Sequence, residues 1–204
     1  LLGSFLRCYV CNNKKIKFYV LHSKSMITDI NIFGIPSFVR SAGELKFCDF
    51  NLIQVASCPK CGFSSHDKEH FKRQETSEPT FSVEEFSKGW EEKIEPLLNK
   101  AKEIGETFYG EDRDTQQAIL SYDLAIATFE QMVSIASNDE KKGAALRKKA
   151  SMLMIQAEML MESQNRDAAE ENLKKVVDAL EPVFESLNGV DIMHTCVLLF
   201  QIKI

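Results

Sequence analysis

Residues 58–62 read Cys58-Pro59-Lys60-Cys61-Gly62, and this pentapeptide decides the fold of the N-terminal part of the chain. Two cysteines three positions apart on a tight turn supply half of the tetrahedral set of thiolates that Zn²⁺ prefers. Gly62 permits the positive-φ backbone that lets amide groups point at sulfur, and Pro59 stiffens the loop. The pentapeptide therefore predicts one half of a zinc ribbon.

A second cysteine pair, Cys8 and Cys11, lies upstream, and 46 residues separate it from Cys58. Four thiolates close the coordination sphere, so we predict one structural rather than catalytic Zn²⁺ per chain. Its predicted ligands are Cys8, Cys11, Cys58 and Cys61. Two redox-active dithiols are the alternative, but these usually occur in a βαβ context, which the sequence lacks. Cys48 is an alternative ligand, although we favour a buried free thiol there.

Short strands and turns are predicted around the two pairs. Ile16–Leu21 and Asn51–Ala56 are rich in β-branched and aromatic residues, which favour strands. Gly34, Pro36 and Gly43, with scattered serines, indicate loops between them. The N-terminal part is therefore expected to be a small, loop-rich β domain.

Helical periodicity begins after a polar stretch, residues 74–80 (QETSEPT), which has the composition of a linker. Ser82 and Glu85 have the spacing of a capping box, which predicts a helix from that point. We expect Pro96 to end this helix and to start the next one. Asp114 has the position of a further N-terminal cap.

The remaining helices carry a pattern of small and large residues that is typical of tetratricopeptide-like helical hairpins. Its members are Leu153, Ala157, Leu160, Ala169, Leu173 and Val176. Residues 163–166 (SQNR) break the pattern, and Pro182 should interrupt it again. A generic antiparallel bundle would give similar stripes and is the alternative. The apolar tail, residues 190–204, is compatible with a helix or a strand.

These patterns together predict an α+β chain. Residues 1–73 are expected to form a zinc-ribbon-like β domain, and residues 74–81 a linker. Residues 82–204 are expected to form an all-α antiparallel domain with tetratricopeptide-like hairpins.

Charge divides the chain in a similar way. The net charge of −5 combines a basic head, residues 1–73, with 11 Lys and Arg against 5 Asp and Glu, and an acidic remainder, with 14 against 25. A basic head can attract phosphates or an acidic partner, although its charge is also compatible with ordinary solvated surface. No apolar run reaches the roughly 18 residues of a membrane span, and Arg7 disfavours a signal peptide. With cysteine pairs typical of a reducing compartment, these features predict a cytoplasmic protein without a membrane partner.

Residues 66–70 read His66-Asp67-Lys68-Glu69-His70 and match the H-x-x-E-H pattern of inverted zinc metalloproteases. On a helix the two histidines would share one face and bind a metal, with Glu69 as general base. The segment is short and polar, follows directly after a cysteine turn, and offers no third ligand. A solvated helical turn is the interpretation we prefer.

The chain also resembles a known family in several stretches. They are Cys48–Phe63 (CDFNLIQVASCPKCGF), Ala118–Phe129 (AILSYDLAIATF), Leu146–Ala157 and Arg166–Leu173. These stretches are similar to the bacterial family catalogued as domain of unknown function 2225. The resemblance implies a zinc-ribbon-like head joined to tetratricopeptide-like helices, and it implies no activity. One departure is the first pair, which reads Cys-Tyr-Val-Cys-Asn instead of the usual Cys-Pro-x-Cys-Gly.

We predict a non-enzymatic interaction or scaffold protein whose helical hairpins bind a protein or peptide partner. The reasons are the closed metal coordination, the hairpins, and the lack of a nucleophile, an acid–base pair or a phosphate-binding loop. Nucleic-acid binding through the basic head is the alternative. Its candidate phosphate contacts are Lys14, Lys15, Lys17, Lys60, Lys68, Lys72 and Arg73. A metalloprotease using His66, Glu69 and His70 is less favoured, and a homo-oligomer is left open.

Overall fold

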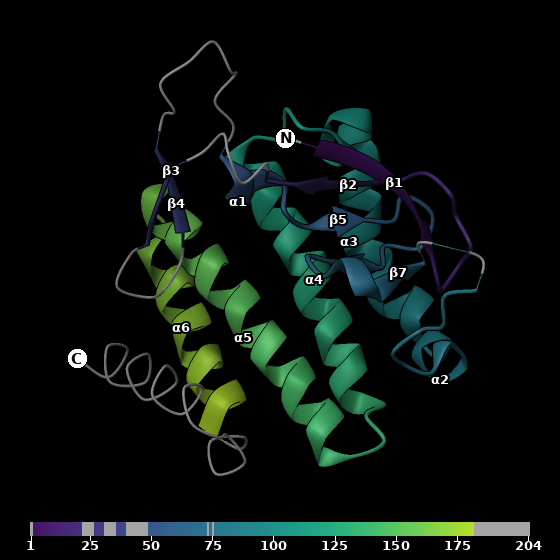
Figure 1. The fold of residues 1–204 in the computed structure, drawn as a ribbon. Coiled ribbons are helices and arrows are strands. Elements are labelled where there is room, and N and C mark those ends of the chain that lie inside the picture. The colour runs from purple at the N-terminus through teal and green to yellow at the C-terminus, as the bar shows by residue number, and fades with distance from the viewer. Residues whose placement is uncertain are drawn as a thin grey trace. The chain divides into compact units, whose positions relative to one another are not determined.

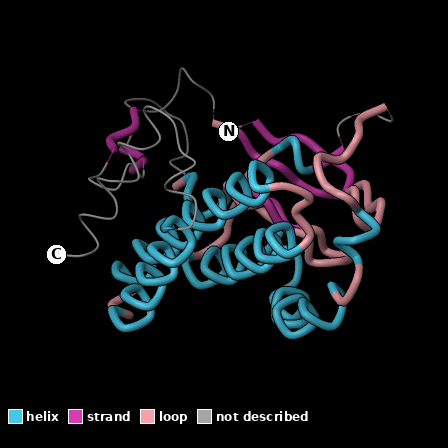
Figure 2. The backbone as a smooth tube through the Cα atoms, turned by 90° about the horizontal axis from the view of Figure 1, so that it is seen from below, coloured by secondary structure: helices cyan, strands magenta, loops and turns pink. Residues whose placement is uncertain are grey.

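The fold is α+β, as predicted, with short antiparallel strands near the N-terminus and helices in most of the rest (Figures 1 and 2). The computed structural model describes residues 2–21, 27–30, 36–39, 49–72, 74 and 76–181. The chain divides into two compact units, residues 1–128 and 129–204. Helices thus accompany the strands in the first unit. The predicted division into a domain of residues 1–73, a linker of residues 74–81 and a domain of residues 82–204 stays a prediction.

The main sheet of the first unit is three-stranded and antiparallel. It has the order β2-β1-β7 and consists of β1 (Leu2–Cys8), β2 (Ile16–Val20) and β7 (Phe71–Lys72). Because side chains alternate along each strand, one face of this sheet belongs to the core. The buried residues on that face are Leu6, Cys8, Ile16, Phe18 and Phe71.

Two short strand pairs complete the β region. β3 (Ile27–Ile30) pairs with β4 (Pro36–Val39), and β5 (Ala56–Ser57) pairs with β6 (Ser64–Ser65), both in antiparallel fashion. The β5–β6 pairing closes the turn that carries the second cysteine pair. The strand predicted over Ile16–Leu21 is confirmed as β2.

The strand predicted over Asn51–Ala56 is wrong. Phe50–Ile53 form the short helix α1, and only Ala56 of the predicted strand belongs to β5. The Asp49 carboxylate accepts a hydrogen bond from the backbone N–H of Asn51 at 2.9 Å and caps the first turn. This cap offsets the β propensity of the residues that follow.

The first longer helical region begins at the predicted capping residue. Ser82 Oγ accepts a hydrogen bond from the backbone N–H of Glu85 at 3.3 Å, and α2 (Val83–Ser87) starts there. The prediction that one helix continues from Ser82 to Pro96 is wrong. Gly89 adopts a φ of +69° and separates α2 from the next helix. A left-handed residue cannot continue an α-helix, and glycine takes that conformation at little cost.

α3 (Trp90–Ile104) runs through Pro96, which we had expected to end a helix. Proline removes one backbone donor and leaves the carbonyl of Glu92 without its helical partner. Both residues are exposed, so water can solvate that carbonyl and the helix continues.

α4 (Thr115–Ser134) follows a 3-10 turn, η2 (Gly105–Tyr109), and begins at the predicted cap. Asp114 Oδ1 accepts a hydrogen bond from the backbone N–H of Gln117 at 2.8 Å. The buried stripe of α4 follows the helical period. It includes Ala118, Tyr122, Ala125 and Phe129.

The second unit contains a helical hairpin formed by α5 (Asp139–Glu162) and α6 (Arg166–Leu180), which pack along each other (Figure 1). The connection contains Gln164 with a φ of +62°, at the predicted break. Asn172 Nδ2 donates a hydrogen bond to Gln156 Oε1 at 2.7 Å within the buried interface.

Pro182 and the tail 190–204 lie outside the described residues. In the part of the chain that the structure describes, no helix combines the length and hydropathy needed to cross a bilayer.

Candidate metal centre

The four predicted cysteine ligands come together in the first unit. Their sulfur atoms all lie within 4.8 Å of one another. Cys8 Sγ is 3.6 Å from Cys61 Sγ, and Cys11 Sγ is 3.4 Å from Cys58 Sγ. Corners of a tetrahedron with metal–sulfur bonds of about 2.3 Å would be about 3.8 Å apart. These two separations are slightly shorter than that value and none of the others exceeds 4.8 Å, so the cluster fits a metal ion with four thiolate ligands.

The two cysteine turns have the same backbone hydrogen bonds, although their sequences differ. In each turn the N–H of the first cysteine donates to the carbonyl five residues later, and its carbonyl accepts from the N–H four residues later. The partners are Asn13 and Asn12 in the first turn, and Phe63 and Gly62 in the second, at 2.9–3.0 Å. The departure of the first pair from the family pattern therefore leaves the geometry of its turn unchanged.

Asn12 and Gly62 occupy equivalent positions with a left-handed backbone, at φ +61° and φ +71°. Asparagine is one of the few residues besides glycine that tolerate this conformation, so it can replace glycine in the first turn. Gly62 meets a second requirement, because a Cβ atom there would lie 2.9 Å from Ile94 Cγ1. The second turn therefore packs against α3 more closely than a side chain allows.

Two side chains outside the cysteine pairs support the centre, and no motif in the sequence indicates either of them. Trp90 is 2% exposed, and its Nε1–H donates a hydrogen bond to the carbonyl of Cys61 at 2.8 Å. Asn13 Nδ2 lies 3.9 Å from Cys58 Sγ and donates towards it. The single tryptophan at the start of a helix gave no signal of this role.

An aromatic cluster underlies the second turn. The ring of Phe63 stacks on Phe81 at 5.5 Å between centroids and meets Phe71 and Phe86 edge-on at 5.5 and 5.3 Å. Phe86 in turn packs against Trp90 at 4.7 Å. These contacts join the turn to the sheet and to α2 and α3, so the metal centre stands on a packed apolar base.

Hydrogen bonds among the four thiols separate their pKa values. Donation by Cys61 lowers the pKa of Cys11 to about 2 and the pKa of Cys58 to about 4. Hydrogen bonding to Cys11, and then to Cys58, raises the pKa of Cys8 and of Cys61 above the ordinary range of a thiol. The site alone thus favours two thiolates and two thiols, whereas a bound dication stabilises four thiolates.

A buried arginine anchors the segment that precedes the second turn. Arg113 is 5% exposed, and its Nη1 donates to the carbonyls of Leu52 and Val55 at 3.2 and 3.1 Å and to Ser121 Oγ at 2.9 Å. Its Nε donates to the carbonyl of Phe108 at 2.9 Å. Burial lowers the pKa of Arg113 to about 10, so the guanidinium stays charged at neutral pH. Nothing in the sequence pattern had indicated this role.

The H-x-x-E-H segment does not form a helix with both histidines on one face. His66 lies in a bend, Lys68–His70 form the 3-10 turn η1, and the chain then enters β7. Among the described residues, the four cysteines are the only group of three or more potential ligands that lie close enough to share a metal.

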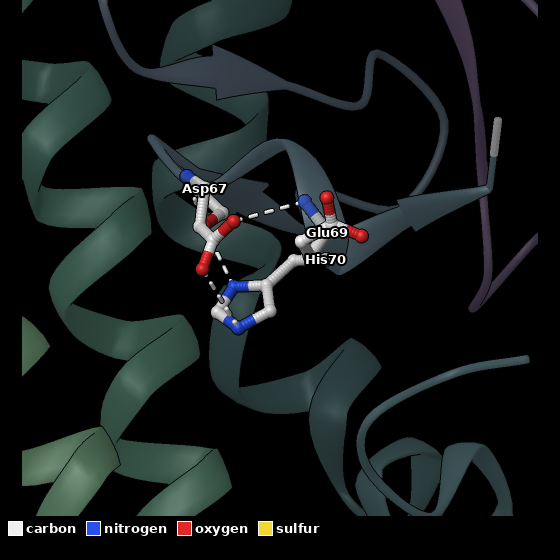
Figure 3. A network of polar contacts seen from close by, with 4 residues as sticks. Asp67, Glu69 and His70 are labelled. Carbon is white, nitrogen blue, oxygen red and sulfur yellow. Dashed lines mark hydrogen bonds and ion pairs between the residues drawn. The ribbon is translucent and has the colours of Figure 1, made fainter.

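His70 instead belongs to a small polar network (Figure 3). It is 6% exposed, its Nδ1 lies 2.8 Å from Ser65 Oγ, and its Nε2 lies 3.9 Å from an Asp67 carboxylate oxygen. Asp67 also accepts a hydrogen bond from the backbone N–H of Glu69 at 2.9 Å. The imidazole therefore helps to fix the turn between β6 and β7.

A groove of about 340 Å³ lies beside the two cysteine turns. The turns contribute Val10, Cys11, Lys60 and Cys61 to its lining. α3 contributes Trp90, Ile94 and Leu98, together with the polar side chains Glu91, Glu95, Asn99 and Lys102. Cys48, the alternative ligand, and Cys196 lie outside the described residues.

No curated protein and no solved structure matches this chain. The family described as uncharacterized protein conserved in bacteria (DUF2225) matches residues 5–201, a range that contains all four cysteines of the centre. The match agrees with the resemblance found in the sequence. The chain therefore belongs to this bacterial family.

Proposed function

We propose that this protein is a non-enzymatic interaction protein whose four cysteines hold one structural Zn²⁺ and whose helices bind a peptide segment of a partner protein. The observation that carries the proposal is the groove beside the cysteine turns, because α3 lines it over most of its length. Four thiolates leave no position for water or substrate on the metal, so the metal would hold the turns that form one wall of the groove.

Zinc is proposed because a closed tetrahedron of four cysteine thiolates is a common structural Zn²⁺ site. Iron can occupy the same four ligands, but it would make the protein coloured and redox-active, so the two metals are easily told apart. Elemental analysis of the purified full chain should give one zinc per chain. Cys58→Ser should lower the metal content, because it removes one of four ligands. An iron content equal to the chain concentration would contradict the assignment.

The groove has the chemistry of a site for a short peptide. Its volume lies within the range of about 300–1,000 Å³ that is common for ligand pockets. Ile94 and Leu98 line the groove one helical turn apart, and because they are only 1% and 7% exposed they offer a narrow apolar strip at its floor. Glu91 and Glu95 lie near the start of α3 and Lys102 near its end. We propose a peptide with an apolar side chain, a basic group facing the glutamates and an acidic group facing the lysine.

Photo-crosslinking from inside the groove would test this proposal. A photoreactive amino acid replaces Asn99, which lines the groove, in the full chain expressed in a bacterium that produces the protein. The matched control carries it at Lys100, which is exposed and does not line the groove. A specific partner should be captured from position 99 and not from position 100, and Glu95→Lys should abolish the capture.

A synthetic peptide covering the crosslinked segment should then bind the purified chain, and Glu95→Lys should weaken its binding at least about tenfold. Equal capture from both positions, or capture unaffected by Glu95→Lys, would contradict the groove assignment. Turnover of a small molecule by the purified protein would contradict the non-enzymatic assignment.

A further inference from the structure

The outer face of the β2-β1-β7 sheet carries an exposed aromatic side chain among basic ones. Phe5 is 69% exposed, the highest value among the exposed large hydrophobic residues of the described chain. Residues opposite each other on antiparallel strands share a face, and Phe5 lies opposite Lys17. Arg7, two positions along β1, lies opposite Lys72 of β7. The sheet therefore presents Phe5, Arg7, Lys17 and Lys72 on one side.

A second aromatic residue lies on the same face. Tyr19 is opposite Gly3, and a Cβ atom at Gly3 would lie 3.5 Å from Tyr19 Cε1. The Tyr19 ring therefore rests on the backbone of β1 at Gly3, two residues from Phe5 along the same face. We refer to Gly3, Phe5, Arg7, Lys17, Tyr19 and Lys72 as the Phe5 face.

The charged residues of the three strands are all basic. The strands β1, β2 and β7 contain no aspartate or glutamate. The turn between β1 and β2 adds Lys14 and Lys15, which are both exposed. A sheet face with aromatic rings among cations complements a polyanion with accessible planar bases.

We propose that the Phe5 face binds single-stranded nucleic acid, with Phe5 stacking on a base and the exposed Lys17, together with Lys14 and Lys15 of the neighbouring turn, contacting phosphates. This inference goes beyond the peptide groove, because it uses a different surface and a different partner. Stacking on Phe5 needs an unpaired base, so the partner is a single strand and not a duplex. Contacts to phosphates do not distinguish RNA from DNA, so the experiment uses both.

An anionic membrane is the other polyanionic surface to consider. Membrane-binding elements combine basic residues with a broad apolar face that enters the headgroup region. The Phe5 face offers one exposed phenylalanine and a half-buried tyrosine, which is little apolar surface for that purpose. The observations therefore favour a nucleic acid.

The test is fluorescence anisotropy of the metal-saturated full chain with labelled oligo-dT, oligo-U and a duplex of the same length, at several salt concentrations. Single strands should bind more tightly than the duplex. The logarithm of the affinity should fall with the logarithm of the salt concentration, with a slope of about −0.7 for each phosphate contact. Phe5→Ala should weaken binding about 5- to 150-fold, whereas Phe5→Trp should preserve it.

Lys17→Ala should reduce the salt slope by about 0.7, and the exposed Lys100→Ala on α3 should change neither affinity nor slope. Far-UV circular dichroism checks that each variant is folded. A parallel sedimentation assay uses vesicles that contain anionic lipids. The proposal is overturned if neither single strand binds at low salt, if Phe5→Ala binds as well as the unmodified chain, or if only the vesicles bind. A failure here leaves the groove crosslinks unaffected, so the two proposals fail separately.

Discussion

Replacing Gly62 by alanine should destabilise the first unit far more than replacing Asn12 by alanine, although both residues occupy the same position in equivalent turns. Both have a left-handed backbone, at φ +71° and φ +61°. They differ in their surroundings, because Asn12 is exposed and Gly62 is buried against Ile94.

The magnitude follows from two contributions. An alanine in the left-handed region costs about 1–2 kcal/mol relative to glycine. A Cβ atom placed 2.9 Å from Ile94 Cγ1 must displace a side chain that is only 1% exposed, and such overpacking costs about 1–3 kcal/mol. Gly62→Ala should therefore lower the free energy of unfolding by about 2–5 kcal/mol. Asn12→Ala changes only the backbone preference and should cost about 1 kcal/mol at most, and Asn12→Gly should be close to neutral.

The assay is urea unfolding in a fixed excess of the metal, because free metal concentration contributes to the stability of the folded state. Trp90, the single tryptophan, reports on the centre because it is buried and hydrogen-bonded to Cys61. A double-mutant cycle with Ile94→Ala isolates the contact. In the Ile94→Ala variant, Gly62→Ala should lower the free energy of unfolding only by the contribution of the left-handed backbone, about 1–2 kcal/mol. An undiminished cost there, or an equal cost for Asn12→Ala, would refute the reasoning.

Arg113→Lys should lower the free energy of unfolding by about 2–4 kcal/mol in the same urea assay, because an ammonium group cannot reach all the acceptors of the guanidinium. Chelation of the metal at neutral pH should shift the Trp90 emission to longer wavelength, and an unchanged spectrum would show that the metal does not hold the second turn. The raised pKa values of Cys8 and Cys61 keep both thiols protonated in the metal-free chain, so metal binding at pH 7 should release about two protons. The apparent affinity for the metal should therefore rise about 100-fold per pH unit. Calorimetry in buffers of different ionisation enthalpy measures this number, and release of about four protons would show ordinary thiols in the metal-free chain. Asn172→Ala should lower the thermal midpoint, because it removes the buried donor to Gln156 at 2.7 Å, and a midpoint equal to that of the unmodified chain would contradict this expectation.

The cysteine cluster could be predicted from sequence because metal ligation depends on residue type and short spacing. Two pairs of the form C-x-x-C predict two turns, and the turns meet in the structure. The first turn departs from the usual Cys-Pro-x-Cys-Gly pattern, and only the structure shows that Asn12 takes the left-handed place of Gly62, a conformation to which asparagine is suited. Helix starts at Ser82 and Asp114 were equally local and were confirmed.

The errors arose where one local preference competed with another. The residues after Asp49 favour a strand by composition, but a cap and a short connection to the second turn favour helix α1. Pro96 was expected to end a helix, but its exposed position makes the lost hydrogen bond inexpensive. Neither outcome follows from propensity alone, because the first depends on the side-chain cap of Asp49 and the second on whether water can reach the carbonyl that Pro96 leaves unpaired.

The supporting residues and the groove were outside the reach of sequence reasoning for a different reason. Arg113 acts on Leu52 and Val55, which are distant in the chain, and no periodicity connects them. The groove likewise requires the cysteine turns and α3 to lie side by side. Such features depend on long-range packing, which a single sequence does not specify by pattern.

The exposure of Phe5 could be inferred only in part from the sequence. Strand composition does not show which face of β1 is buried, but the role of Cys8 as a metal ligand does. Alternation in β1 places either Leu6 or Phe5 in the core, and both are apolar. Cys8 ends the same strand, and its sulfur must point towards the other three ligands. Even-numbered residues then face inward, so Leu6 is buried while Phe5 is displayed. A register slip by one residue would exchange the two faces and withdraw the ligand, so metal binding opposes the slip. The metal centre thereby determines which side chains the sheet can offer to a partner, although none of its ligands lies on the Phe5 face.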